Sequence, residues 1–220
     1  MERRSQARRI LAALEKHHPN AFTELVFHNP FELLIATILS AQCTDERVNR
    51  LTPHLFQRFP DANSLSGASL DELEALVKPT GFFRSKARSL LSIASALVDR
   101  HHGEVPTSME ALLKLPGVGR KTANVVLGHA LDIPGLPVDR HVLRVSHRLG
   151  LTQSNNPVIV ETELGSLFPP ARWTRVSDTL IFHGRRICKP RPQCDRCHAR
   201  NDCGHTADTQ DKPTPPQRGR

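Results

Sequence analysis

Apolar side chains recur at helical spacing in one segment of this chain after another. Between residues 85 and 101, for example, Ala87, Leu90, Leu91 and Ala94 follow the i, i+3, i+4, i+7 pattern of an amphipathic helix. The sequence has no sustained alternation with a period of two and no Asn-Gly or Asp-Gly hairpin turn, which argues against a sheet of any size. We therefore predict an all-α fold.

Capping residues set several of the expected helix ends. Ser69 with Glu72, and Thr107 with Glu110, have the spacing of a capping box at a helix N-terminus. The segments expected to be helical are residues 6–17, 31–41, 70–77, 85–101, a shorter stretch after Thr107, 120–131, 139–149, 157–168 and 173–186. The second of these is apolar nearly all round, which is typical of a central buried helix.

Two histidine doublets stand where helices are expected to end. They are His17-His18, just before a proline, and His101-His102, just before a glycine. Histidines near a helix C-terminus interact favourably with the helix dipole while they stay in water. We expect all four side chains to be solvated.

The balance of charge is basic. The chain has 30 Lys and Arg against 22 Asp and Glu, a net charge of +8 and an isoelectric point near 9.8. This balance indicates a polyanionic partner such as nucleic acid. The longest apolar stretch, residues 31–41, is shorter than the roughly 20 residues that cross a bilayer, and the basic N-terminus leads into no apolar signal segment. We expect a cytoplasmic protein with no membrane partner.

A glycine-rich segment, LPGVGRKT, lies between two of the expected helices. Two glycines on either side of an apolar residue make a tight turn whose backbone N–H groups, with the N-terminus of the next helix, form an anion site. Gly117, Val118 and Gly119 are therefore candidate contacts to a DNA phosphate, in a helix-hairpin-helix that holds DNA without reading its sequence. A plain helix connector remains the alternative.

Two charged residues follow this turn. Lys121 lies in the first turn of the next helix, where the helix dipole disfavours a cation. With partial burial, this position favours the neutral amine, which is the nucleophile that forms Schiff bases. A lysine that only contacts phosphate is the alternative. Asp139 occupies the expected N-cap of a later helix, and on this evidence alone it is a cap.

Four of the five cysteines fall close together near the C-terminus. Cys188, Cys194, Cys197 and Cys203 have the spacing C-x5-C-x2-C-x5-C, whereas Cys43 lies apart in an apolar context. In a reducing cytosol such a cluster indicates a metal site rather than disulfides. Four thiolates hold either a zinc ion or a [4Fe-4S] cluster, and the spacing does not decide between them.

Four landmarks in chain order resemble the endonuclease III family, a group of DNA glycosylases with lyase activity. They are LSAQCTD at residues 39–45, LPGVGRKTANVVL at 115–127, VDRHVLRV at 138–145 and the loop with four cysteines. The family belongs to the helix-hairpin-helix and Gly/Pro-Asp superfamily. The resemblance covers about residues 5–205.

The resemblance implies two helical domains with a DNA-binding cleft between them. Residues 23–133 would form the domain with the helix-hairpin-helix, and residues 1–22 plus 134–205 the domain with the cluster. Residues 206–220 are polar and contain prolines, so we expect a disordered tail there.

The resemblance also assigns roles to individual residues. Lys121 matches the catalytic lysine and Asp139 the catalytic aspartate. Gln42 and Phe82 match residues that enter the double helix when a damaged base is flipped out, although a Phe-Phe pair after glycine is otherwise typical of a core. His141 matches a contact to DNA.

For the four cysteines, Cys188, Cys194, Cys197 and Cys203, the resemblance favours a [4Fe-4S] cluster over zinc. The family has one residue more between the first two cysteines than the five found here. Lys189, Arg191 and Arg196 lie in the same loop and are expected to contact DNA phosphates.

Together these expectations describe a base-excision-repair DNA glycosylase with AP lyase activity. It would remove oxidised pyrimidines from duplex DNA through a lysine Schiff base and cut the strand 3′ to the abasic site by β-elimination. Its expected partner is double-stranded DNA with damaged pyrimidines or abasic sites, in a bacterial cytoplasm at the nucleoid, and we expect a monomer. Two alternatives stay open: a monofunctional adenine-excising glycosylase, which Lys121 opposes, and a non-catalytic hairpin module with a structural metal.

Overall fold

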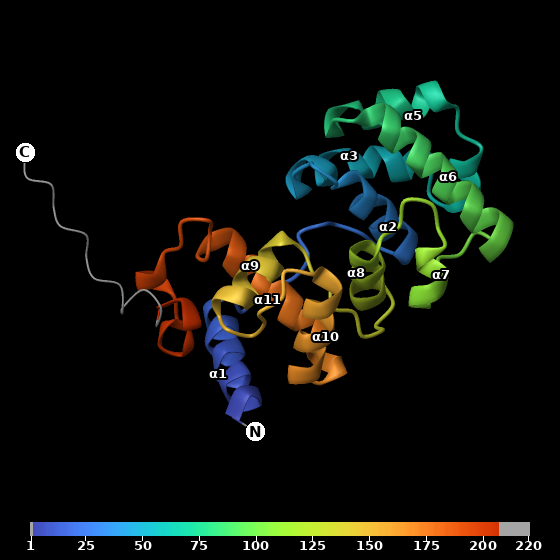
Figure 1. Ribbon diagram of the computed structural model, residues 1–220. Coiled ribbons are helices and arrows are strands. Elements are labelled where there is room, and N and C mark those ends of the chain that lie inside the picture. Colours follow the sequence, from blue (N-terminus) through green and yellow to red (C-terminus); the bar gives the residue numbers. More distant parts are fainter. Residues whose placement is uncertain (1, 207–220) are drawn as a thin grey trace, which may run out of the picture. The chain divides into compact units, whose positions relative to one another are not determined.

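The computed structural model describes residues 2–206, and the regular elements within that range are all helices (Figure 1). The prediction of an all-α fold is confirmed. The α-helices are α1 (Glu2–His17), α2 (Pro30–Leu39), α3 (Asp45–Arg58), α4 (Ala62–Ser66), α5 (Leu70–Val77), α6 (Phe83–His101), α7 (Met109–Leu113), α8 (Arg120–Ala130), α9 (Arg140–Arg148), α10 (Pro157–Leu167) and α11 (Trp173–Arg186). Short 3-10 helices are η1 (Lys78–Thr80), η2 (Pro170–Arg172), η3 (Cys194–Arg196) and η4 (Arg200–Asp202).

No helix in the described range is both long and apolar enough to cross a membrane. Most of the expected tail, from residue 207 onward, lies outside the described residues. Thr206, the first residue of that expected tail, is buried, and its hydroxyl donates to the carbonyl oxygens of Arg200 and Cys203 at 2.8 Å each.

The described residues divide into two compact units. One, which we call the hairpin unit, is Thr23–Pro137 and contains α2 to α8. The other, which we call the cysteine unit, consists of the described residues up to Phe22 and from Val138 onward, with α1, α9, α10 and α11. In sequence, the hairpin unit is thus inserted into the cysteine unit.

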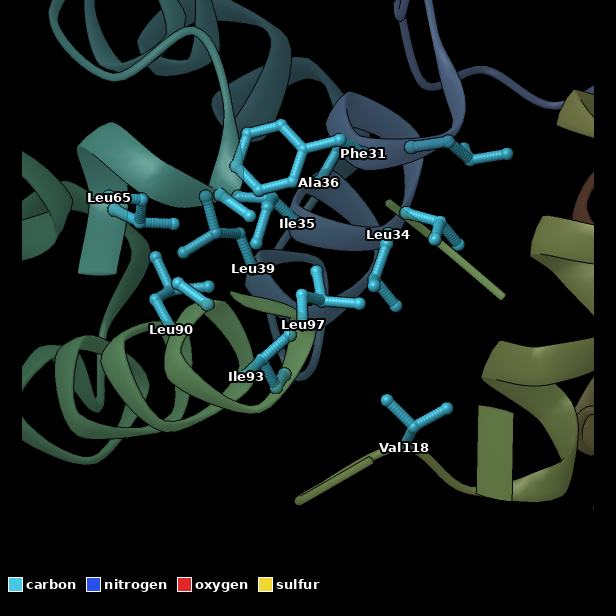
Figure 2. Packing of buried hydrophobic residues seen from close by; sticks show 14 of the residues in the cluster. Phe31, Leu34, Ile35, Ala36, Leu39, Leu65, Leu90, Ile93, Leu97 and Val118 are labelled. Atoms are coloured by element: carbon cyan, nitrogen blue, oxygen red, sulfur yellow. The ribbon is translucent and has the colours of Figure 1, made fainter. Parts of the chain in front are cut away.

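The central element of the hairpin unit is α2. It begins after Asn29, whose side chain accepts from the Glu32 N–H at 2.9 Å, and it packs against α3, α6 and α8. Figure 2 shows its aliphatic side chains among those of α6 in the core. Four consecutive side chains of α2 are fully buried, namely Leu33, Leu34, Ile35 and Ala36. The prediction of a central buried helix is confirmed, and its apolar residues on every face are the physical reason.

Some local boundaries differ from the sequence prediction. The helices α3 and α4 were not predicted; α3 contains Pro53 in its interior, which weakens the helical signal although its apolar residues face the core. The cap of α7 is Ser108, whose hydroxyl accepts from the Ala111 N–H at 3.2 Å, and not Thr107. The cap at Ser69 is confirmed, since its hydroxyl accepts from the Glu72 N–H at 3.2 Å.

In the cysteine unit, α11 packs against both α9 and α1. The crossing of α9 and α11 depends on Gly184. A Cβ atom at this position would lie 3.0 Å from His141 Cβ and 3.0 Å from Val145 Cγ2, so a larger residue would push the two helices apart. The glycine therefore brings α9, with its N-terminus at residue 140, directly against α11.

The loop after α8 packs back onto that helix. The Leu136 N–H donates to the buried Asn124 side chain at 3.1 Å, and the Ile133 N–H donates to the Leu127 carbonyl at 3.0 Å. Between them, a Cβ atom at Gly135 would lie only 2.3 Å from the Asn124 carbonyl oxygen. Because both atoms belong to backbone or begin a side chain, neither can move aside without shifting the helix or the loop. Residues 133–136 thus pack with the hairpin unit.

We predict that Gly135→Ala lowers the free energy of unfolding by about 1–3 kcal/mol, the usual effect of forcing extra volume into a packed site. Gly67→Ala is the control, because a Cβ atom there would have only ordinary contacts, the nearest at 3.8 Å. Urea unfolding of both variants measures the difference. Equal stability of the two would contradict the close approach at Gly135.

Candidate functional site

The helix-hairpin-helix turn connects α7 to α8. Gly117 has a φ of 75°, in the left-handed region that glycine adopts without strain. Val118 is buried in the core of the hairpin unit (Figure 2), and its N–H donates to the Leu115 carbonyl oxygen at 3.2 Å. Val118 therefore anchors the turn, and the expected use of its N–H for an anion is not available in this conformation. Gly119 is exposed and forms the N-cap of α8.

A pocket in the hairpin unit brings this turn together with two distant segments. It encloses about 800 Å³ of space, partly open to solvent. The lining residues come from the end of α2 and the turn after it, from the turn before α6 and the first part of α6, and from the hairpin turn with the start of α8. They are Thr37, Ile38, Ala41, Gln42, Phe82, Ser85, Lys86, Ser89, Gly117 and Thr122. Three residues predicted from the sequence to contact DNA, Gln42, Phe82 and Gly117, thus line one pocket.

Gln42 and Phe82 share an unusual backbone conformation. Their φ angles are 55° and 48°, in the left-handed region that side chains other than glycine rarely occupy. Such strain persists where the surrounding structure fixes the backbone, and it occurs preferentially at functional sites. Phe82 is 68% exposed, whereas Phe83 packs against the core. The core interpretation therefore applies to Phe83 and not to Phe82.

Lys121 is the second residue of α8 and is exposed. Its neighbour Thr122 lines the pocket described above. The partial burial assumed in the sequence argument is not present in this structure. The position in the first turn, next to the positive end of the helix dipole, is as expected.

Asp139 is the N-cap of α9. Its Oδ1 accepts hydrogen bonds from the N–H groups of His141, at 2.7 Å, and Val142, at 2.9 Å. The cap interpretation is therefore confirmed. A cap fixes the rotamer of the carboxylate, and it does not exclude a second role.

His141 is half-buried on α9, where burial lowers its pKa. Arg144 Nη2 lies 3.1 Å from His141 Nδ1 and 2.9 Å from the Gly184 carbonyl oxygen, to which it donates. Because a guanidinium only donates, Nδ1 of His141 must accept, which assigns the imidazole proton to Nε2. His141 is thus a neutral donor on the first turn of α9.

The four clustered cysteines line a single cavity of the cysteine unit. The cavity has about 330 Å³ of empty space, part of it open to solvent. Burial and the neighbouring cysteines raise the pKa of the Cys197 thiol to about 11, and burial raises the pKa of Cys203. Thiols of this kind become thiolates at neutral pH only when a cation stabilises them.

The loop around these cysteines is attached to α9 by arginines. Arg144 Nε donates to the Cys188 carbonyl oxygen at 3.1 Å. Arg148 donates to the carbonyl oxygens of Lys189, at 2.6 Å, and Pro190, at 2.9 Å, and its Nη1 lies 3.5 Å from Cys188 Sγ. The short arm of five residues after Cys188 is therefore fastened along its first half.

Among the described residues, no three His, Cys, Asp or Glu side chains are placed as the ligands of one metal ion would be. The four cysteines nevertheless face one cavity. Four thiols that line one cavity are a donor set that suits a metal centre with sulfur ligands.

Histidines pack beside this loop, although the sequence predicts solvated side chains for two of them, His17 and His18. His18 is buried, and its Nε2 lies 3.1 Å from Nδ1 of His183, whose Nε2 lies 3.5 Å from Cys197 Sγ. His17 stacks on His18, with ring centroids 4.5 Å apart, and its ring is tilted against that of His198, with centroids 4.0 Å apart. Burial lowers the pKa of His18 to about 4 and that of His183 to about 3, so both are neutral at pH 7. The expectation for the first doublet is wrong, because its burial depends on contacts with α11.

Lys189, Arg191 and Arg196 are exposed on the cysteine loop. Arg196 Nη1 donates to the Gln193 side chain at 2.8 Å. Their exposure leaves three basic side chains on one surface loop, which is compatible with the predicted contacts to phosphates.

Comparison with known proteins gives consistent relatives. Residues 35–170 match the HhH-GPD superfamily of base excision DNA repair proteins. Endonuclease III of Synechocystis sp. is 49% identical over 203 residues, which cover 91% of this chain and 93% of that protein. Endonuclease III of Escherichia coli is 38% identical over 195 residues, which cover 88% and 92%.

A solved structure of a trapped covalent intermediate of endonuclease III with DNA has the same fold. It superposes with a TM-score of 0.88 at 41% identity and covers 94% of this chain and 98% of that one. The extent of both sequence and structural similarity settles the family: the chain belongs to the HhH-GPD superfamily of base excision DNA repair proteins and, within it, to the endonuclease III family.

Proposed function

We propose that this protein is a base-excision-repair DNA glycosylase with AP lyase activity, acting on oxidised pyrimidines and abasic sites in duplex DNA. The observation that carries the proposal is the position of Lys121. It is an exposed lysine directly after the hairpin turn, and its neighbour Thr122 lines the same pocket as Gln42 and Phe82. A hairpin that only bound phosphate would need no pocket of this kind.

Extrusion of the damaged base comes first, because a base inside the duplex cannot reach Lys121. The exposed aromatic ring of Phe82 and the amide of Gln42 would fill the gap that the base leaves. An apolar wedge and a hydrogen-bonding group suit this task, since one replaces stacking and the other replaces pairing. Their shared pocket supports a joint role.

The chemical step uses the amine of Lys121. Attack of Nζ on C1′ breaks the glycosidic bond, and the base leaves with the bonding electron pair. Opening of the sugar ring gives an iminium, which acidifies the proton on C2′. Loss of that proton forms a double bond between C2′ and C3′, conjugated with the iminium at C1′, and breaks the C3′–O bond to the 3′ phosphate. The strand is thus cut by β-elimination. Hydrolysis of the iminium then returns the free lysine.

Asp139 would provide the negative charge that this step needs. Breakage of a glycosidic bond develops positive charge on the sugar, which a fixed carboxylate stabilises. The same carboxylate can accept the proton that Lys121 must lose before it attacks. The hydrogen bonds that make Asp139 a cap hold its Oδ1, so its orientation is set before DNA binds.

Cys188, Cys194, Cys197 and Cys203 would hold a [4Fe-4S] cluster. The cavity that all four cysteines line supports this assignment, because it brings four sulfur ligands together in one place. When bound, the cluster supplies a rigid link among four points of an irregular loop. The chain itself then presents Lys189, Arg191 and Arg196 to DNA phosphates, and His141 adds a neutral N–H donor.

The function is tested on a duplex with one oxidised pyrimidine, with the products separated before and after alkali. We expect the native protein to cut the strand without alkali, and Lys121→Ala to bind the duplex but to leave it uncut. Cleavage only after alkali by the native protein would identify a monofunctional glycosylase. Binding without release of the base in either protein would identify a non-catalytic module.

For Asp139 we predict that Asp139→Asn lowers turnover about 100-fold or more, as expected for loss of a positioned base or charge. Asparagine is as good an N-cap as aspartate, so the thermal midpoint should not change. Asp139→Ala is the matched comparison: it should lose turnover and also about 1 kcal/mol of stability with the cap. Full turnover in Asp139→Asn would show that Asp139 is only a cap.

For the cluster we predict that the purified native protein is brown and contains iron with acid-labile sulfide. Cys197→Ser should lose most of the iron and most of the sulfide. It should also melt at a lower temperature, because the cluster binds the folded loop and not the unfolded chain. Cys43→Ser, outside the loop, is the control and should keep both. A colourless protein that contains zinc would contradict the assignment.

A further inference from the structure

Lys86 is a buried lysine that none of the roles above uses. It lies in the first turns of α6 and is only 6% exposed. Its Nζ donates two hydrogen bonds to backbone carbonyl oxygens, to Leu39 at 2.8 Å and to Thr80 at 2.9 Å. Both acceptors belong to segments distant from each other in sequence, and the ammonium group joins them.

The two acceptors are the last residues of helices that lead into the pocket. Leu39 ends α2, and Gln42 follows three residues later. Thr80 ends η1, and Phe82 follows two residues later. Lys86 thus ties together the two segments that carry the exposed residues in the left-handed conformation.

The backbone of Lys86 extends this link. Its N–H donates to the Phe82 carbonyl oxygen at 3.0 Å, so that Lys86 binds the chain on both sides of Gly81. Gly81 itself has a φ of 69°, so residues 81 and 82 are two successive residues with a positive φ. A turn of this kind is held by contacts outside it, because its own backbone conformation is unfavourable.

The position of Lys86 is otherwise unfavourable for a lysine. Burial lowers its pKa, because a charged amine loses its hydration there. The first turns of a helix also repel a cation. The ammonium group is stabilised instead by its two acceptors, because the carbonyl oxygens at the C-terminus of α2 and at the end of η1 carry partial negative charge. A methionine would fill the same space without these costs, but it would join nothing.

We propose that Lys86 is a positioning residue that holds Gln42 and Phe82 in register, so that both enter the DNA together when a base is flipped out. The proposal rests on the proposed function, because it assigns Gln42 and Phe82 to the gap in the duplex. Lys86 acts through these two residues and touches no reacting atom. Its loss therefore affects extrusion of a stacked base and leaves the chemistry of Lys121 intact.

The test variant is Lys86→Met, which keeps the stem and removes the donors. Lys114→Met is the matched exposed control, since Lys114, the C-cap of α7, is paired with Glu110 on the surface. Leu73→Ala, at a fully buried position of α5, is the control for general loss of stability in the same unit. Thermal melting of each variant fixes an assay temperature at which all are folded.

Two substrates separate extrusion from chemistry: a duplex with a paired oxidised pyrimidine and the same duplex with a preformed abasic site. We expect Lys86→Met to cut the duplex with the paired lesion about tenfold or more slowly than the native protein, which is the effect of losing hydrogen bonds to a charged group. On the abasic site its cleavage rate should stay within about twofold of the native rate. Lys114→Met and Leu73→Ala should change the cleavage rate on neither substrate, compared with the native protein. Equal losses of Lys86→Met on both substrates would show a merely structural lysine and overturn the proposal.

A double-mutant cycle tests whether Lys86 acts through its two neighbours. In a protein that already carries Gln42→Ala and Phe82→Ala, we expect Lys86→Met to slow cleavage of the paired lesion by less than about a further twofold, because the side chains that Lys86 positions are gone. Independent, multiplying losses would overturn the proposal. If Lys86→Met does not fold, Lys86→Gln replaces it; its shorter amide reaches one carbonyl at most, and we expect a smaller loss that is again confined to the paired lesion.

A fluorescent 2-aminopurine placed opposite the lesion gives a readout that does not depend on cleavage. Entry of Gln42 and Phe82 unstacks this base, so its fluorescence should rise on binding of the native protein and much less with Lys86→Met. If the native protein raises the fluorescence but never cuts, the proposed function fails while the role of Lys86 is still measured. If the native protein leaves the fluorescence unchanged, the positioning role is wrong whatever the enzyme cleaves.

Discussion

Burial of α2 on nearly every side is the constraint on which the hairpin unit depends. Because Leu33 to Ala36 are apolar on all faces, other helices must surround them, and α3, α6 and α8 do so. Gln42 follows shortly after the C-terminus of this buried helix. Phe82 is the N-cap of α6, and Lys121 lies in the first turn of α8. One packed core thereby fixes the elements that carry these three candidate functional residues, as rigid sites require.

The cysteine unit uses hydrogen bonds where the hairpin unit uses apolar packing. Its loop from Cys188 to Cys203 contains only two short 3-10 helices, so other elements must hold its backbone. Arg144 and Arg148 of α9 donate to carbonyl oxygens at its start, and Gly184 lets α9 lie close enough to α11 for these contacts. Asp139 is the N-cap of the same helix α9, so the carboxylate proposed for catalysis and the loop share one support.

Local patterns in the sequence were enough to predict the class of fold and most helices. The apolar residues of α2 and the cap at Ser69 act within a few residues, and both predictions are confirmed. Features that depend on distant contacts were missed. His18 is buried by His183, 165 positions away, and Lys86 binds Leu39, 47 positions away. The shared pocket of Gln42, Phe82 and Gly117 likewise unites three segments that no local pattern connects.

The central claim is that Lys121 becomes covalently attached to the sugar during the reaction. Borohydride reduces an iminium to a stable amine, so it traps such an intermediate on the DNA. The account predicts that the native protein, mixed with a duplex containing one oxidised pyrimidine and borohydride, gives an adduct whose modified peptide contains Lys121, and that Lys121→Ala gives none. An adduct at another residue, or none at all from metal-replete protein that binds the duplex tightly, would contradict it.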